Sequence, residues 1–143
     1  MTTTIKTSPK ERKLGFRVLF LAMFAIGTGQ TLFISVLPPY ARGLGLSEVQ
    51  VGFIFSLSAL GWMMMSPFWG RKSDFIGRKS IIILGLIIYA FTTILMGLEF
   101  RLNELGYINL STLFGLLIFT RGCYGFLGSG AHSASMAYVA DRT

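Results

Sequence analysis

Acidic, redox-active and metal-binding residues are scarce in this sequence. Its 143 residues include six aspartates and glutamates, one histidine and one cysteine. The single cysteine, Cys123, excludes an internal disulfide, and so few ligand side chains predict no metal site and no cofactor. A membrane enzyme would need clustered His, Asp, Glu or Cys at the membrane face. We therefore expect no enzymatic activity.

Positive charge is more abundant, with thirteen lysines and arginines and a net charge of +7. Most of these residues lie within residues 1–17 and 70–79. A nucleic-acid-binding surface would spread basic side chains along one face of a helix, and no predicted helix has such a face. Basic clusters beside apolar runs instead indicate cytoplasmic segments of a membrane protein, so we expect no nucleic-acid partner.

Four long, charge-poor runs dominate the sequence, at about residues 18–37, 49–69, 80–98 and 110–139. At 1.5 Å per residue each run can cross a bilayer as a helix. Residues 1–17 form a polar N-terminal tail, and Pro38-Pro39 is expected to end the first helix. Ser47 and Gln50 have the spacing of a capping box, which predicts the start of the second. The chain is therefore expected to be an all-α membrane protein with four transmembrane helices.

The stretch Gly70–Lys79 (GRKSDFIGRK) lies between the second and third runs and is expected to be a short loop. Gly70 and Gly77 give its backbone freedom, and Asp74 can accept hydrogen bonds from Arg78 or from a helix N-terminus. A short basic loop between two spans predicts the cytoplasmic side of the membrane. The N-terminus should then be cytoplasmic too, while Arg42 and the expected outer loop from residue 99 to 109 lie outside.

The fourth run carries Arg121 near its middle, and no acid accompanies it in the first three runs. An arginine that faces lipid at this depth costs at least about 2.5 kcal/mol, so Arg121 must face protein or water. At 100° per residue, Gly125, Gly128 and His132 lie on the same side of the helix. This side predicts a polar cavity, in which Gln30 or backbone carbonyls between residues 122 and 130 bind the guanidinium.

Two of these polar residues allow alternative interpretations. Gln30 is either part of the cavity wall or a hydrogen-bonding group between packed helices, which is common in membrane proteins. His132 is either a satisfied polar group near the inner interface or part of a proton relay. The sequence leaves both choices open.

Two motifs resemble those of the major facilitator superfamily. The spacing G-x-x-x-D-x-x-G-R-K in residues 70–79 resembles the family's signature loop between helices 2 and 3, with Phe75 where a basic residue is usual. The arginine and spaced glycines of residues 121–128 resemble its helix 4 motif, with Tyr124 where glutamine is common. Residues 36–40 (VLPPY) and 66–70 (SPFWG) are similar to the drug:proton antiporter branch.

The resemblance implies the first four helices of a twelve-helix fold, with one three-helix repeat and the start of its inverted partner. It implies a proton-coupled efflux transporter of amphipathic, drug-like small molecules that works by alternating access in the plasma (inner) membrane. The resemblance also implies a conformational latch, a loop that shifts the balance between transporter conformations, formed by Gly70, Asp74, Gly77, Arg78 and Lys79. The proton-coupling and cavity residues would be Arg121, Gly125, Gly128, Gln30 and His132.

The implied partners are the bilayer, protons, the substrate and the missing C-terminal helices. Because the resemblance covers about a third of the family's length, we do not expect the chain to transport alone. The alternative is a small four-helix membrane-interaction or accessory protein without transport activity. The small multidrug transporters, which also have four helices, carry a glutamate in their first helix. The first apolar run here has no acid, and this argues against them.

Overall fold

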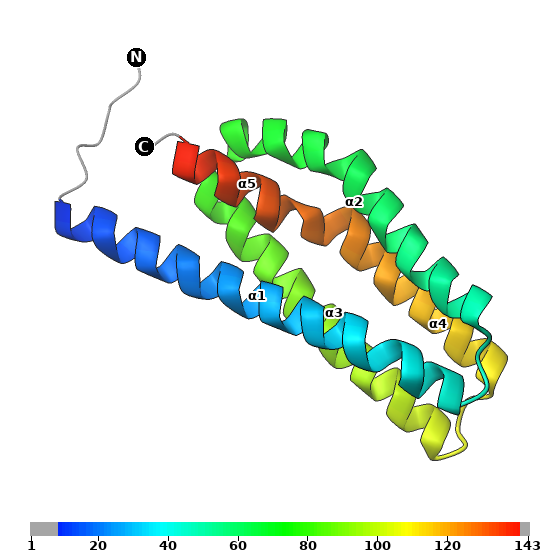
Figure 1. Ribbon diagram of the computed structural model, residues 1–143. Coiled ribbons are helices and arrows are strands. Elements are labelled where there is room, and N and C mark those ends of the chain that lie inside the picture. Colours follow the sequence, from blue (N-terminus) through cyan, green and yellow to red (C-terminus); the bar gives the residue numbers. More distant parts are fainter. Residues whose placement is uncertain (1–8, 141–143) are drawn as a thin grey trace.

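The chain folds into four long helical rods, shown in Figure 1. The computed structural model describes residues 9–140, with side chains from residue 13 onward. Its elements are α1 (Pro9–Gly43), α2 (Glu48–Ile76), α3 (Arg78–Glu104), α4 (Leu110–Cys123), the π-helix η1 (Tyr124–Gly128) and α5 (Ser129–Ala140). The last three form one continuous rod. Each rod is long and apolar enough to cross a membrane, which confirms the predicted all-α architecture of four spans.

The rods alternate in direction, so the α1–α2 and α3–α4 connections lie at one end of the bundle (Figure 1). The predicted capping box is present, with Ser47 and Gln50 each bonding to the other's backbone. The expected helix end at Pro38-Pro39 is wrong, because α1 continues to Gly43. Membrane helices tolerate proline where freed backbone groups find other partners.

The expected loop of residues 70–79 is almost entirely helical. Helix α2 runs to Ile76, α3 begins at Arg78, and Gly77 is the only residue between them. Gly77 has φ 101° and ψ 130°, a conformation that essentially only glycine adopts. The direction of the chain therefore reverses at one glycine, and the charged side chains lie on helix ends. Figure 1 also shows α2 bending in its second half, where Pro67 interrupts the helical hydrogen bonds.

The expected outer loop from residue 99 begins later than predicted, because α3 continues to Glu104. Glu99 is thus part of a helix and only 3% exposed. Its carboxylate accepts a hydrogen bond from the Thr120 hydroxyl of α4. The prediction that the first three spans hold no acid is therefore wrong, because α3 extends far enough to include Glu99. The Thr120 hydroxyl on another helix gives this buried carboxyl group a hydrogen-bond partner.

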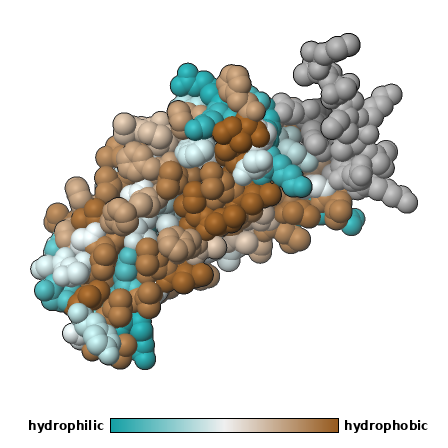
Figure 2. Space-filling view, turned by 180° about the vertical axis from the view of Figure 1, so that it is seen from behind, coloured by the Kyte–Doolittle hydropathy of each residue, from teal (hydrophilic) through white to brown (hydrophobic). Residues whose placement is uncertain are grey.

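Two apolar clusters hold the rods together, one near each end of the bundle. The first lies near the α1–α2 and α3–α4 connections and includes Ile54, Leu113 and Leu117, which are fully buried. The second, near the opposite end, includes Trp69 and Ile81. Most other large apolar side chains are exposed, and they form a hydrophobic surface between more polar ends in Figure 2. Such a surface fits a lipid environment or contact with further helices.

Candidate functional site

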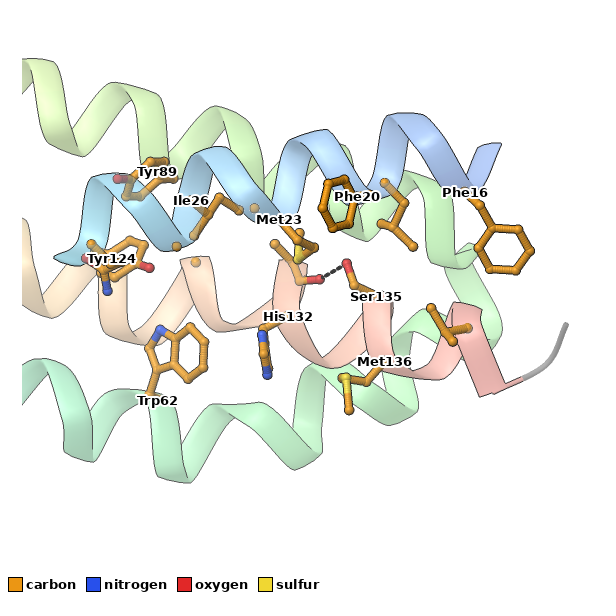
Figure 3. Close-up of a pocket in the computed structure, with 17 residues that line it drawn as sticks. Phe16, Phe20, Met23, Ile26, Trp62, Tyr89, Tyr124, His132, Ser135 and Met136 are labelled. Carbon is orange, nitrogen blue, oxygen red and sulfur yellow. Dashed lines mark hydrogen bonds between the residues drawn. The ribbon is translucent and has the colours of Figure 1, made fainter. Parts of the chain in front are cut away.

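A cavity of about 540 Å³ separates the first half of α1 from the other rods. Its wall is mostly apolar and aromatic and includes Phe20, Met23, Trp62, Tyr89 and Tyr124. Figure 3 shows these side chains converging from α1, α2, α3 and η1. The predicted residues Gln30, Gly128 and His132 also line this cavity, hereafter the main cavity. A site of this chemistry would bind an apolar, ring-containing molecule.

Arg121 is buried and only 6% exposed, and its neighbours Gln30 and Tyr124, but not Arg121 itself, line the main cavity. As predicted, Arg121 faces α1 and α2. Its Nη1 donates a long hydrogen bond of 3.5 Å to Gln30 Oε1, and its Cζ lies 4.3 Å from the Phe33 ring centroid. The rings of Phe55 and Tyr124 lie 5.7 Å and 5.1 Å from Cζ. The guanidinium is therefore held mainly by aromatic faces, each worth about 2 kcal/mol when desolvated.

The charge of Arg121 has no acidic counterpart in the part of the chain that the structure describes. No ion pair to Arg121 is formed there, and its Nε is buried without a hydrogen-bond partner. Gln30 and Arg121 together line two further cavities, one of about 570 Å³ between α1 and α2 and one of about 370 Å³ between α1 and α3. Several donors of the guanidinium are thus left available to a ligand or to water that enters these cavities.

The π-helix η1 changes which residues share a face of the fourth rod. A π-helical turn holds more residues than an α-helical one, so it rotates everything that follows relative to a 3.6-residue repeat. Gly128 and His132 line the main cavity, whereas Gly125 is buried against α2. A Cβ atom on Gly125 would lie 2.5 Å from the Ser58 carbonyl oxygen. The prediction that these glycines and His132 share one side of the helix with Arg121 is therefore only partly right. Gly125 contacts α2 and does not line the main cavity.

Helix α2 also holds η1 in place through a hydrogen bond. Trp69 Nε1 donates to the Phe126 carbonyl at 2.8 Å. A π-helix shifts the usual partners of backbone carbonyls, and here a side chain from another rod satisfies one of them. The π-helix is consequently tied to α2 at both Gly125 and Phe126.

His132 leaves α5 on the side that faces α2, as Figure 3 shows. Its ring centroid lies 5.3 Å from that of Trp62, with the planes tilted by 44°. The histidine is solvent-exposed and lines the main cavity, whereas Arg121 lines the neighbouring cavity between α1 and α2, which His132 does not reach. The imidazole stands at the cavity wall, where it can meet a molecule inside the cavity.

The segment of residues 70–79 forms its predicted ion pair. Arg78 Nη2 lies 2.9 Å from Asp74 Oδ1 across the Gly77 break. Lys72 lies on the other side of α2, over the rings of Phe68 and Trp69. Phe75, which stands where a basic residue was expected, is 91% exposed. The pair therefore joins the end of α2 to the start of α3 and leaves Phe75 available for contact with another part of the protein.

Comparison with known proteins agrees with this architecture. The family model of the Major Facilitator Superfamily matches residues 19–143. This chain belongs to that superfamily. It is 32% identical over 139 residues to Multidrug resistance protein 2 of Bacillus subtilis. The aligned region covers 97% of this chain and 32% of that protein. The chain is 41% identical over 73 residues to Quinolone resistance protein NorA of Staphylococcus aureus, covering 51% of the chain and 19% of that protein.

The chain thus spans about a third of the length of the first of these superfamily relatives. No solved structure matches it. The sequence reasoning that identified the superfamily missed the aromatic residues around Arg121, namely Phe33, Phe55, Trp62 and Tyr89. Aromatic residues are frequent in every apolar run here, so nothing in the sequence distinguished the ones that face the cavities.

Proposed function

We propose that this chain forms part of a transporter that exports small molecules across the plasma membrane in exchange for protons. The observation that carries the proposal is Arg121, a buried cation without an acidic partner in the described residues, which lines two cavities. A buried, unpaired charge in a membrane span is costly, and such residues commonly mark substrate or ion pathways. Membership of the superfamily and the names of the two relatives support transport of drug-like molecules.

The cavity walls support an amphipathic substrate with aromatic rings. The main cavity offers ring faces from Trp62 and Tyr124 and flexible apolar contacts from Met23. Such side chains adapt to many shapes, because they bind through area and stacking rather than through a fixed hydrogen-bond pattern. Gln30 and Arg121 add a polar end to this surface. A molecule with an apolar ring system and one polar group would use both parts.

The segment around Asp74 would act in the conformational change between inward-open and outward-open states. Its ion pair with Arg78 fixes the angle of two helix ends at a single non-helical residue, Gly77. The exposed Phe75 and the basic residues beside it offer a contact for a second half of the transporter. We assign this segment to the cytoplasmic side, with the N-terminus, on the basis of its positive charge.

The test is export from proteoliposomes that contain this chain together with the remaining helices of the complete transporter, with a fluorescent quinolone as the probe and an imposed pH gradient. We expect Arg121→Ala to abolish gradient-driven export while the protein inserts normally. Arg121→Lys should restore only part of it, because a point charge cannot replace the planar guanidinium between aromatic rings. The control is Arg101→Ala, which removes an exposed arginine at the end of α3.

Wild-type export by the Arg121→Ala variant would contradict a coupling role for this residue. No export by the complete transporter under any gradient would instead favour the second candidate, a membrane-interaction or accessory protein without transport activity. The exposed apolar surface of the rods is the observation that keeps this candidate open, since it suits contact with other membrane helices.

A further inference from the structure

Glu99 stands apart from all other acidic side chains in the described part of the chain because it alone is buried. It lies in α3 against α4, where Thr120 is 1% exposed. Met96 and Leu117, each within one turn on its own helix, belong to the first apolar cluster. The carboxyl group therefore sits at a packed helix interface and lines neither the main cavity nor the two cavities around Arg121.

The hydrogen bonds available to Glu99 are too few for a carboxylate. Thr120 Oγ1 donates to Oε1, and Oε2 is buried with no partner among the described residues. An ionised carboxylate can accept about four hydrogen bonds, two at each oxygen. Leaving a buried charge with one neutral donor costs several kcal/mol, whereas a neutral carboxylic acid avoids most of that penalty.

Charged neighbours do not compensate for this shortage. The nearest titratable groups along α1, α3 and α4 are Tyr40, Arg101, Glu104 and Arg121. Tyr40 and Arg101 both bond to Glu104, at the exposed end of α3. The guanidinium of Arg121 points to Gln30 and Phe33 on α1. None of these four groups forms a hydrogen bond or ion pair with Glu99 among the contacts of residues 13–140.

We propose that Glu99 is a proton-binding site, in which the carboxyl group holds a proton while α3 and α4 are packed as they are here. Thr120 is its positioning residue, since its hydroxyl bonds to the carboxyl from the facing helix. Proton binding neutralises the side chain and lets the interface close without an unpaired charge. Release of the proton would place a negative charge at this interface and weaken the packing beside Arg121, the next residue along α4.

The proposed function needs a group that binds and releases the coupled proton, and Glu99 supplies one. This coupling role of Glu99 rests on the proposed function. Arginine stays protonated in proteins, so Arg121 cannot itself bind and release the coupled proton. Glu99 can, because carboxyl groups gain and lose protons readily and the Glu99–Thr120 bond connects it to the residue before Arg121. Protonation of Glu99 itself follows from its burial and bonding and does not require that the protein transports anything.

The experiment is infrared spectroscopy of the purified protein in lipid nanodiscs at neutral pH, without substrate or gradient. We expect a carbonyl-stretch band of a protonated carboxyl group in the wild type that is absent from Glu99→Gln. Thr120→Val should shift this band, because the carboxyl loses its hydrogen bond. Thr93→Val, which removes a hydroxyl on α3 that bonds to Tyr89, is the matched control and should leave the band in place.

Equal spectra of the wild type and Glu99→Gln in the carboxylic-acid region would overturn the proposal, since Glu99 would then be ionised. If Glu99→Gln does not fold, a wild-type band that Thr120→Val leaves unshifted would overturn it as well. Neither result depends on export, so failure of the proteoliposome assay would count against the proposed function alone.

Discussion

Close backbone contact at Gly125 shows how one residue can decide the packing of two rods. Its Cα lies so near α2 that an added Cβ would be 3.0 Å from Ser58 Cα and closer still to the Ser58 carbonyl oxygen. These atoms belong to the backbone of a buried helix segment and cannot move aside alone. The glycine is therefore explained by helix contact, although sequence reasoning placed it on a cavity wall.

We predict that Gly125→Ala destabilises the protein by about 1–3 kcal/mol, the usual cost of overpacking. Thermal unfolding in detergent, followed by tryptophan fluorescence, would measure the change. The matched control is Gly115→Ala in α4, where an added Cβ meets no atom within 4 Å. There, alanine's higher helix propensity should leave stability unchanged or raise it by up to about 1 kcal/mol. Equal stability of the two variants would argue against the close contact.

At the scale of elements, the junction between α2 and α3 depends on Gly77 and on the ion pair that spans it. The family resemblance suggested a loop, yet the structure makes nearly all of it helix. The same charged side chains then project from rigid helix ends, which orients them more firmly than a loop would.

Gly77→Ala should strain this junction, because its φ of 101° is unfavourable for any residue with a Cβ. We expect a loss of about 1–3 kcal/mol in thermal stability. Gly70→Ala is the control within the same motif, since Gly70 is helical and open space surrounds it. A Gly77→Ala protein as stable as Gly70→Ala would show that the backbone can relax at this point.

Asp74→Asn should leave the amount of protein in the membrane unchanged and lower quinolone export. The ion pair with Arg78 is about half-exposed on the aspartate side, so it contributes at most about 1 kcal/mol to stability. A loss of export without a loss of stability would therefore indicate a role in the conformational change. Glu48→Gln, which breaks an equally simple surface pair with Arg42 at the other end of the bundle, is the control. Export at the wild-type rate by Asp74→Asn would contradict the latch.

For the whole molecule, the distribution of charge predicts the orientation in the membrane. Five basic residues precede residue 18, four lie in residues 70–79, and Arg142 follows the fourth rod in the undescribed end of the chain. Only Arg42 and Arg101 belong to the opposite end of the bundle. By the positive-inside rule, we predict that the α2–α3 junction lies in the cytoplasm.

Single-cysteine labelling tests this orientation. In a Cys123→Ser background, Glu104→Cys should react with a membrane-impermeant maleimide added to intact cells, and Asp74→Cys should react only after the membrane is opened. Both side chains are at least partly exposed, so access to solvent does not distinguish them. Labelling of position 74 from outside would reverse the proposed topology.

Features that depend on local physical chemistry could be predicted from the residues alone. Runs of apolar residues predicted the four spans, because bilayer thickness sets the length of a helix that crosses it. The capping box at Ser47 and the pair Asp74–Arg78 follow from spacings of three and four residues. Arg121 had to face protein, since the cost of exposing a guanidinium to lipid is known in advance.

Which distant residues meet depends on how the rods pack against one another. Glu99 looked like a loop residue until the Thr120 hydroxyl of another rod gave it a buried partner. The π-helix η1 could not be predicted, because a regular 3.6-residue repeat contains no such turn. Contacts with α2, at Gly125 and through the Trp69 hydrogen bond, hold it in place. Such contacts join residues tens of positions apart, and helical periodicity describes each helix alone, without the neighbour that stabilises it.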